Sequence, residues 1–221
     1  MKTAIKYIVG TTWQPLLKKY LGKTRRYSYQ NIRLQIPSSV FHPGFFFSTQ
    51  LLLEQIKDLP IENKKLLEPG AGSGLISIYA AQRGALVTAT DINPTAVEFL
   101  YHNAEANNVR LTVVESDLFS RLHPQAFDVI AINPPYYKKA PQSFADYAWF
   151  CGEHGEYFQE LFAGLKNYMH AETMVLMVLC DGCDMEMVKE VARANGYSMR
   201  VIYTKKNLLE TNFIYRIQLR K

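Results

Sequence analysis

The sequence predicts an α/β fold with a doubly wound sheet of seven strands, mostly parallel, and an antiparallel hairpin at the C-terminal end. Three observations predict it. Strand-like and helix-like segments alternate from Lys64 onward, which is typical of a parallel sheet with helices on both faces. A glycine-rich loop separates the first strand of this series from its first helix. The last two strands have no helix between them, so we expect them to pair as a hairpin.

The individual elements follow from their apolar patterns. Phe127–Ile132 is an apolar run broken only by Asp128, which is typical of a buried strand. Pro94 sits in the first turn of its helix, where a missing N–H costs nothing, and Gly196 ends the last helix. We expect strands near 64–68, 86–91, 110–115, 127–132, 173–179, 197–204 and 212–220, and helices near 74–83, 94–107, 153–169 and 184–194.

Length and composition indicate one folded domain with a short added segment. The chain has 221 residues, of which 48% are hydrophobic, enough for a sizeable core. The longest apolar run, Met174–Cys180, is far shorter than the ~20 residues needed to span a membrane. Met1–Val9 starts like a signal peptide, but Lys6 interrupts it. We expect a cytoplasmic protein without a membrane partner, with a basic N-terminal segment at 1–37 and the main domain at 38–221.

Positive charge is concentrated near the N-terminus. Residues 1–53 hold eight Lys and Arg and no Asp or Glu, a charge of +8, whereas the whole chain carries +5, so residues 54–221 carry −3. Tyr20, Tyr27 and Tyr29 lie among these cations, and basic residues with aromatic ones suit a nucleic-acid backbone with bases to stack on. A solvated face that keeps the protein soluble is the other interpretation. We expect an amphipathic helix at 4–20 and an edge strand at 33–36.

A glycine loop follows the first strand of the alternating series, in the segment Glu68-Pro69-Gly70-Ala71-Gly72-Ser73-Gly74. Gly70 and Gly72 permit positive φ and close approach of a ligand, and Gly74 lets the next helix start close to the sheet. The free N–H groups of that helix can bind a polar ligand. The spacing G-x-G-x-G differs from the dinucleotide fingerprint G-x-G-x-x-G. The loop therefore indicates a nucleotide-type site without naming the nucleotide.

The tetrapeptide Asn133-Pro134-Pro135-Tyr136 closes the strand at 127–132. Neither proline can donate to a strand ladder and both fix φ near −65°, so the chain leaves the sheet with a stiff backbone. The Asn side-chain oxygen and the main-chain carbonyls then point beyond the strand end, beside the flat face of the tyrosine. This arrangement suits a planar N–H₂ group, with two acceptors for its hydrogens and a ring to stack on. A plain turn is the alternative, because Asn-Pro is a common turn former.

Two further acids stand at strand ends. Asp91 ends the strand at 86–91, where a carboxylate commonly binds a ribose diol in doubly wound sheets. Asp117 follows the strand at 110–115 and is suited to accept from an adenine amino group. Either acid alone could be a helix cap or a solvated loop acid. The glycine loop, the two acids and the tetrapeptide, each after a predicted strand, favour a Rossmann-like nucleotide site.

These motifs resemble those of class I S-adenosylmethionine-dependent methyltransferases that carry N-P-P-Y. Over residues 38–221 the chain is most similar to the HemK-like release-factor glutamine methyltransferases and the small-domain nucleobase N-methyltransferases. The resemblance implies S-adenosylmethionine as cofactor and no metal. It implies cofactor-binding roles for Thr49, Glu68, Gly70, Ala71, Gly72, Gly74, Asp91, Ile92, Asp117, Leu118 and Asn133. It implies that the catalytic residues Asn133, Pro134, Pro135 and Tyr136 hold the acceptor nitrogen.

The activity expected from the resemblance is methyl transfer to a planar amine or amide nitrogen. Release-factor enzymes of this kind carry a larger helical domain before the catalytic domain, whereas the segment here is short and basic. This difference favours a nucleic acid, RNA rather than DNA, over a glutamine of a translation protein as the acceptor. The basic and then aromatic loop at 137–150 is expected to help form the acceptor pocket.

Two other classes of function compete with methyl transfer. A nicotinamide-dependent oxidoreductase would share the sheet and Asp91, but the loop spacing and the tetrapeptide argue against it. A non-catalytic RNA-binding protein would share the fold, but it would have no reason to keep an intact tetrapeptide.

Cysteine usage indicates reduced thiols. The chain has three cysteines, an odd number, which argues against a disulfide framework. Cys180-Asp181-Gly182-Cys183 is a C-x-x-C at the end of a predicted strand. It indicates redox chemistry or zinc binding only weakly, because neither a thioredoxin-like context nor a second cysteine pair accompanies it.

Overall fold

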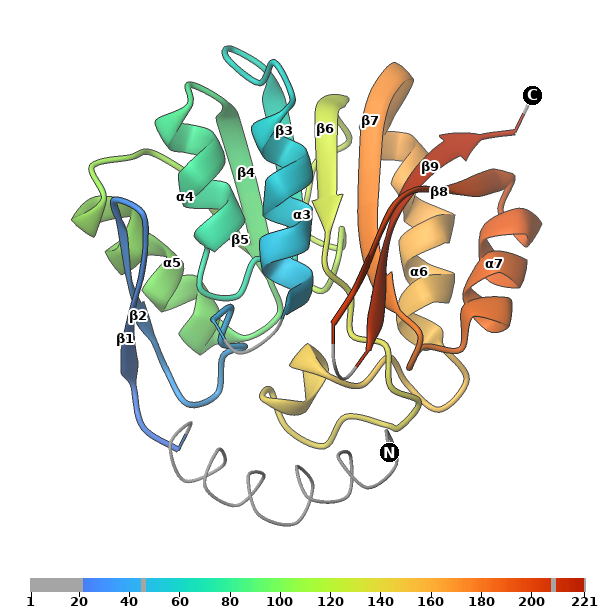
Figure 1. Ribbon diagram of the computed structural model, residues 1–221, viewed down its shortest axis with the longest axis horizontal. Helices are drawn as coiled ribbons and strands as arrows, with labels where there is room; N and C mark the ends of the chain where they lie inside the picture. Colours follow the sequence, from blue (N-terminus) through green and yellow to red (C-terminus); the bar gives the residue numbers. More distant parts are fainter. Residues whose placement is uncertain (1–21, 45–46, 208–209, 221) are drawn as a thin grey trace.

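The centre of the protein is a seven-stranded sheet in the order β5-β4-β3-β6-β7-β9-β8 (Figure 1). The computed structural model describes residues 22–44, 47–207 and 210–220, so the helix expected at 4–20 lies outside the described residues. Strands β3 to β7 pair in parallel, and β9 pairs antiparallel with both β7 and β8. The predicted mixed sheet and its C-terminal hairpin are confirmed. The strands are β3 (Lys65–Pro69), β4 (Leu86–Asp91), β5 (Thr112–Glu115), β6 (Phe127–Ile132), β7 (Met169–Cys180), β8 (Tyr197–Lys206) and β9 (Thr211–Leu219).

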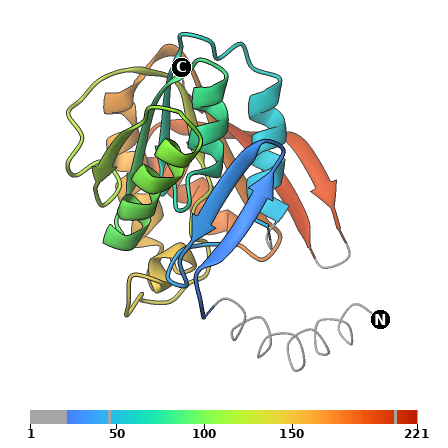
Figure 2. The same ribbon diagram turned by 90° about the vertical axis from the view of Figure 1, so that its left-hand side faces the viewer.

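Helices cover both faces of the sheet. One face packs against α3 (Phe47–Lys57), α4 (Leu75–Gln82) and α5 (Pro94–Ala106). The other face packs against α6 (Glu156–Leu165) and α7 (Met185–Ala194), as Figures 1 and 2 show. Short 3₁₀ turns lie at Asp146–Ala148 and Lys166–Tyr168. None of the helices in the described part of the chain is long and apolar enough to cross a bilayer.

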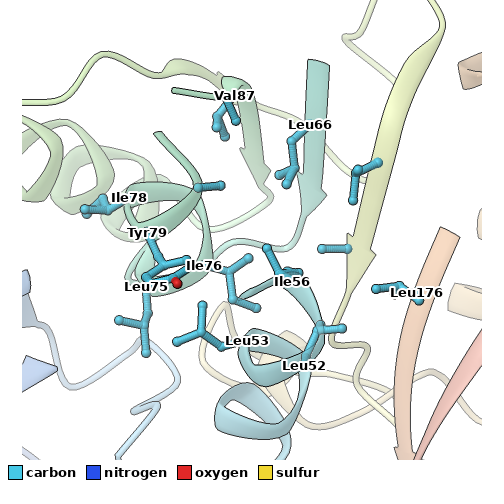
Figure 3. Packing of buried hydrophobic residues seen from close by; sticks show 14 of the residues in the cluster. Leu52, Leu53, Ile56, Leu66, Leu75, Ile76, Ile78, Tyr79, Val87 and Leu176 are labelled. Atoms are coloured by element: carbon cyan, nitrogen blue, oxygen red, sulfur yellow. The ribbon is translucent and has the colours of Figure 1, made fainter. Parts of the chain in front are cut away.

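The central strand β3 shows how the two layers are joined. Leu66 points toward α3 and α4 and belongs to the same cluster as Ile56 and Leu75 (Figure 3). The next residue, Leu67, points the other way and packs with Phe158 of α6. Both leucines are completely buried, and burial of one such side chain contributes about 1.5–3 kcal/mol. Successive residues of a strand point to opposite faces, so β3 must be apolar on both sides.

Three elements differ from the sequence-based expectations. Helix α3 was not predicted as a helix, because its consecutive Leu51, Leu52 and Leu53 are all buried and leave no amphipathic period. The helix expected at 153–169 was too long: α6 begins only after Gly155, which has φ of +78°. The chain then passes through a 3₁₀ turn and enters β7 at Met169, four residues earlier than expected.

The basic N-terminal region contains a hairpin that packs against helices α4 and α5. Its strands are β1 (Arg25–Tyr29) and β2 (Ile32–Ile36), where the sequence had indicated a single edge strand at 33–36. Ile32, Leu34 and Ile36 point inward and are buried, so β2 contributes to the core beside α4 and α5.

Asn103 of α5 and Asn107, which caps its C-terminal end, form hydrogen bonds with the backbone of β2 as a neighbouring strand would. The Asn103 side chain accepts from the Gln35 N–H at 2.8 Å and donates to the Gln35 carbonyl at 3.0 Å. One turn later, the Asn107 side chain makes the same pair of bonds with Arg33, at 2.9 and 2.7 Å. Asn103 also donates to the carbonyl of Ser73 in the glycine loop at 3.0 Å. The hairpin and the glycine loop are therefore held by one side chain.

Replacing Asn103 by Ala should lower the free energy of unfolding by about 2–3 kcal/mol. The change leaves the buried carbonyl of Ser73 and the partly buried carbonyl and N–H of Gln35 without a partner, and each lost hydrogen bond costs about 0.5–1.5 kcal/mol. Asn107→Ala removes a similar pair of bonds at an exposed position, where water replaces them, and should cost less. Urea denaturation of the two variants measures the difference. An equal or smaller loss for Asn103→Ala would contradict the bridging role.

Candidate active site

A cleft lies at the carboxyl ends of the parallel strands, where β4 and β6 flank β3 on its two sides. The chain proceeds from β3 to β4 in one direction and returns to β6 in the other, so this is the switch point where ligands bind in open α/β sheets. The sequence-predicted residues that line the cleft are Thr49, Glu68, Gly70, Ala71, Gly72, Asp91, Ile92, Asp117, Leu118, Asn133, Pro134, Pro135 and Tyr136. The cleft lining does not include Gly74.

The glycine loop uses its glycines in two different ways. Gly70 has φ of +71°, and a Cβ added there would meet no atom within 4 Å, so its backbone faces open space. Gly74 has φ of +84°, and a Cβ there would lie 2.6 Å from a methyl group of Leu100 in α5. Gly74 therefore serves close packing of α4 against α5, whereas Gly70 leaves room for a ligand.

Glu68 is a buried carboxyl at the start of the glycine loop. One of its oxygens accepts from the backbone N–H and from the hydroxyl of Ser77 in the first turn of α4. Burial raises the pKa of Glu68 to about 8, although the two bonds from Ser77 lower it. The carboxyl is therefore largely neutral at pH 7 in the free protein. A cation placed beside it would favour the ionised form.

Asp91 joins three parts of the site. Its two oxygens accept from the N–H of Gly72 at 2.8 Å and from the N–H of Asn93 at 2.9 Å. Burial raises the pKa of Asp91, and these backbone bonds oppose the rise. The Asn93 side chain caps α5 through Thr95 N–H and donates to the carbonyl of Ser39 at 3.0 Å. The glycine loop, the end of β4 and the segment after β2 are thus connected around one carboxylate.

The end of β5 forms the next wall of the cleft. Asp117 is exposed and Leu118 is buried. Leu118 has φ of +44°, an uncommon conformation for a residue with a branched side chain. Its carbonyl accepts weakly from the Thr90 hydroxyl at 3.4 Å, which links it to β4. The turn therefore presents an apolar side chain and an acid to the cleft at adjacent positions.

The tetrapeptide after β6 places its asparagine in a defined orientation. The side-chain nitrogen of Asn133 donates to the hydroxyl of Thr49, a buried residue of α3, at 3.1 Å. This bond leaves the side-chain oxygen of Asn133 for a ligand in the cleft. Pro134 and Pro135 are buried, and burial raises the pKa of the Tyr136 hydroxyl, which stays protonated. The tetrapeptide is thus rigid, neutral and rich in hydrogen-bond acceptors.

The loop at 137–152 folds back along the tetrapeptide and carries aromatic residues to the cleft. Tyr137 N–H donates to the carbonyl of Trp149 at 3.0 Å, and Cys151 N–H donates to the carbonyl of Tyr137 at 3.0 Å. The ring of Trp149 lies 5.3 Å from that of Phe41, centre to centre. Phe144 and Tyr147 line the same cleft while 50% and 40% of their surface remains exposed. The mouth of the cleft therefore has an aromatic wall of four rings.

Some cleft residues, such as Ser39 and Tyr157, were not predicted as site residues, and others were indicated only by the segment to which they belong. Ser39, Val40 and Phe41 reach the cleft because Asn93 holds the segment after β2. Tyr157, in the first turn of α6, lines the cleft near Asp91 and Asp117, and burial raises the pKa of its hydroxyl. Phe144 and Tyr147 belong to the loop that the sequence indicated as basic and aromatic. Among the described residues, no group of three His, Cys, Asp or Glu side chains is arranged to hold a metal ion.

The comparisons with known proteins agree with this geometry. The family model described as "Methyltransferase small domain" matches residues 32–150, more than half of the chain. A Methanocaldococcus jannaschii protein, provisionally named a protein N5-glutamine methyltransferase, is 37% identical over 146 residues, which cover 63% of this chain and 72% of that protein. A tRNA1(Val) (adenine(37)-N6)-methyltransferase of Shewanella loihica is 40% identical over 90 residues, which cover 36% of this chain and only 37% of that enzyme.

Solved structures share the fold at low sequence identity. A T. thermophilus 16S rRNA N2 G1207 methyltransferase in complex with AdoMet and guanosine has a TM-score of 0.65 at 16% identity, covering 90% of this chain and 50% of that one. A ribosomal protein L11 methylase of Lactobacillus delbrueckii subsp. bulgaricus has a TM-score of 0.61 at 18% identity, covering 82% of both chains.

Replacing Glu68 by Gln should make the stability of the protein less dependent on pH. The folded-state pKa of about 8 lies above the ordinary value of 4.5, so the contribution of Glu68 is full below pH 4.5 and is lost as pH rises through 8. The free energy of unfolding of the wild type, relative to Glu68→Gln, should fall by a few kcal/mol between about pH 5 and 9. Urea denaturation across this range measures it, and parallel pH curves for the two proteins would exclude a buried neutral carboxyl.

Proposed function

Because the chain belongs to the methyltransferase small domain family, it is an enzyme that uses S-adenosylmethionine, and we propose that it methylates the exocyclic amino nitrogen of a nucleobase in RNA. The observation that carries the proposal is the orientation of Asn133. Its side-chain nitrogen is engaged by Thr49, so its oxygen is left for an N–H₂ group, in a cleft with an aromatic mouth.

The residues of the glycine loop and the acids fit the cofactor. S-adenosylmethionine supplies a methyl group activated by a sulfonium charge. Gly70 offers unfilled space beside its backbone, and Glu68 lies in the same part of the cleft. We infer that Glu68 becomes ionised beside the positive methionine end of the cofactor. Asp91 and Asp117, at the ends of adjacent strands β4 and β5, would hold the ribose and the adenine.

Transfer to an aromatic amine requires the enzyme to stabilise positive charge on nitrogen. The lone pair of such an amine is delocalised, and no side chain in the cleft is basic enough to deprotonate it first. The Asn133 oxygen and the Pro134 carbonyl would accept the two N–H hydrogens. These bonds strengthen as the nitrogen becomes positive, which stabilises the transition state more than the ground state. Tyr136 would fix the plane of the acceptor, and correct alignment can supply about 7–11 kcal/mol.

The aromatic wall favours a nucleobase over an aliphatic side chain. Phe144 and Tyr147 keep half or nearly half of their surface exposed at the cleft mouth, although exposed rings cost free energy in water. Stacking of a base on a ring is worth about 1–3 kcal/mol. A glutamine side chain has no comparable flat apolar surface. The exposed rings are therefore best explained by a planar aromatic acceptor.

The β1–β2 hairpin supplies positive charge beside the cleft. Arg25 pairs with Ile36 and Arg26 with Gln35, at the end of the hairpin from which the chain continues into Ser39, a cleft residue. The exposed Arg26 lies at this end, whereas Arg33 lies opposite Ser28 near the turn of the hairpin. Asn103 fixes the Gln35 position that pairs with Arg26. A rigid basic edge next to the acceptor mouth suits the phosphate backbone of RNA.

A glutamine side chain of a translation protein is the second candidate acceptor. The M. jannaschii relative is named as a protein N5-glutamine methyltransferase, and the match covers 72% of its length. An amide presents the same planar N–H₂ to Asn133 as a nucleobase does, so the tetrapeptide serves either acceptor.

Transfer of labelled methyl into an extract of the source cells tests the proposal. Label should be released by nuclease and not by protease, and Asn133→Ala should incorporate none. The change Arg26→Gln, which removes one charge, should weaken transfer to RNA and reduce its salt dependence. Lys64→Gln, which removes one charge at the opposite end of β3, is the matched control. Label that resists nuclease and appears on glutamine would establish the second candidate instead.

The orientation of Asn133 predicts different results for two changes of Thr49. Thr49→Val keeps the shape but removes the hydrogen-bond partner, so kcat should fall about tenfold, the equivalent of ~1.4 kcal/mol. Thr49→Ser keeps the hydroxyl and should stay close to the wild type. Calorimetry should find cofactor affinity unchanged in both variants. A loss of cofactor affinity with kcat intact would mean that Thr49 serves the cofactor rather than Asn133.

A further inference from the structure

The C-x-x-C segment forms a tight turn directly behind the tetrapeptide. Cys180 is the last residue of β7, and the Cys183 N–H donates to its carbonyl at 3.0 Å. The two sulfur atoms lie 3.9 Å apart. Cys180 is buried, whereas Cys183 is partly exposed on a turn whose Asp181 and Gly182 are exposed. The pair therefore has one inner and one accessible sulfur.

Contacts join this turn to Tyr136. The Tyr136 hydroxyl and the Cys180 sulfur are neighbours that affect each other's pKa, raising that of Tyr136 and lowering that of Cys180. The ring of Tyr137 lies 4.9 Å from that of Tyr136 and also lies against the turn, since a Cβ on Gly182 would be 3.8 Å from Tyr137 and 3.4 Å from the Cys180 sulfur. The turn that carries the two cysteines is thus linked to Tyr136 through the ring of Tyr137.

The surroundings stabilise a single negative charge on the two sulfurs. The thiol of Cys183 and the hydroxyl of Tyr136 lower the pKa of Cys180 by hydrogen bonding, and burial opposes them. The backbone N–H of Cys180 in turn donates to the Cys183 sulfur at 3.3 Å. Hydrogen bonding to Cys180 and burial raise the pKa of Cys183, so the Cys183 thiolate is the minor form of the pair. It forms when the shared proton passes to Cys180, and it then lies on the partly exposed residue, where an oxidant can reach it. Thiolates rather than thiols react in this way.

We propose that Cys180 and Cys183 are a reversible oxidation site whose disulfide state slows methyl transfer by releasing Tyr136. The inference rests on the proposed role of Tyr136 in holding the acceptor. The oxidant is a peroxide. The Cys183 thiolate attacks one peroxide oxygen, which gives a sulfenic acid and hydroxide. Cys180 sulfur then displaces hydroxide from the Cys183 sulfur, and its proton passes to that hydroxide. The two thiols lose two electrons, and hydrogen peroxide is reduced to two waters.

Formation of this bond changes the partner of Tyr136 in two ways. A disulfide sulfur carries no negative charge and is a weak acceptor, so its attraction for the neighbouring tyrosine hydroxyl is weakened. The sulfurs must also approach from 3.9 Å to about 2.05 Å, which moves the Cys180 side chain or the turn. Tyr136 and Tyr137 then lose the contact that fixes their rings.

Treatment of the full-length enzyme with peroxide tests the oxidation site by two measurements, peptide mapping by mass and the kcat of methyl transfer. Free thiols are trapped by alkylation, and peptide mapping should show a disulfide between Cys180 and Cys183 and a free Cys151. The kcat should fall about tenfold, the size expected for one lost hydrogen bond at the acceptor. Cofactor affinity by calorimetry should stay unchanged, and a thiol reductant should restore kcat. Cys183→Ser and Cys183→Ala should keep kcat and become insensitive to peroxide.

Different results test the disulfide between Cys180 and Cys183 and the coupling of that disulfide to Tyr136. A free dithiol after peroxide, or a disulfide that includes Cys151, overturns the oxidation site. A disulfide between Cys180 and Cys183 with unchanged kcat overturns the coupling to Tyr136. Peptide mapping needs no acceptor, so it decides on the site even if RNA is not the substrate. The rate is then followed with whichever acceptor takes up label, so a failure of the RNA proposal is seen in a different experiment.

Discussion

Parallel pairing of β3 with both β4 and β6 is the constraint on which the rest of the structure depends. Parallel strands end at the same edge of a sheet, so every segment that follows them meets there. This places the glycine loop, Asp91 and Asn133 around one cleft although they are far apart in sequence. Leu66 and Leu67, buried on opposite faces of β3, hold the helices that cover both sides. The chemistry of the site is therefore possible only because the middle of the sheet is apolar on both faces.

Asparagine side chains hold the parts of the site that the sheet cannot reach. Asn103 and Asn107 pair with the backbone of β2 as a strand would. Asn93 holds the segment that carries Phe41 toward the cleft, and Asn133 is oriented by Thr49. An amide carries both donors and acceptors, so one residue can satisfy two backbone groups. The bonds of Asn103 and Asn107 attach the basic hairpin to the C-terminal half of α5.

Electrostatics distinguish the inner part of the cleft from its rim. Burial raises the pKa of Glu68 and of Asp91, and backbone or hydroxyl donors compensate part of the cost of burying these acids. A buried acid that is neutral without ligand and ionised beside a cation suits S-adenosylmethionine. The rim instead presents the exposed rings of Phe144 and Tyr147. Tyr136 of the tetrapeptide lines the same cleft and is also a neighbour of the Cys180 sulfur.

The alternating strands, the C-terminal hairpin, the glycine loop and the tetrapeptide were predictable from the sequence, because each depends on local backbone preferences: apolar runs, positive φ at Gly70, and prolines that end a strand. Helix α3 was not predictable, because the three consecutive buried residues Leu51, Leu52 and Leu53 obscure its amphipathic period. Nor could local pattern show that Gly74 packs against Leu100, that Thr49 orients Asn133, or that Cys180 contacts Tyr136. The sequence by itself determined which segments carry the chemistry. Only the tertiary structure decided which side chains meet, because those contacts join residues that no local periodicity relates and that the sheet alone brings to one edge.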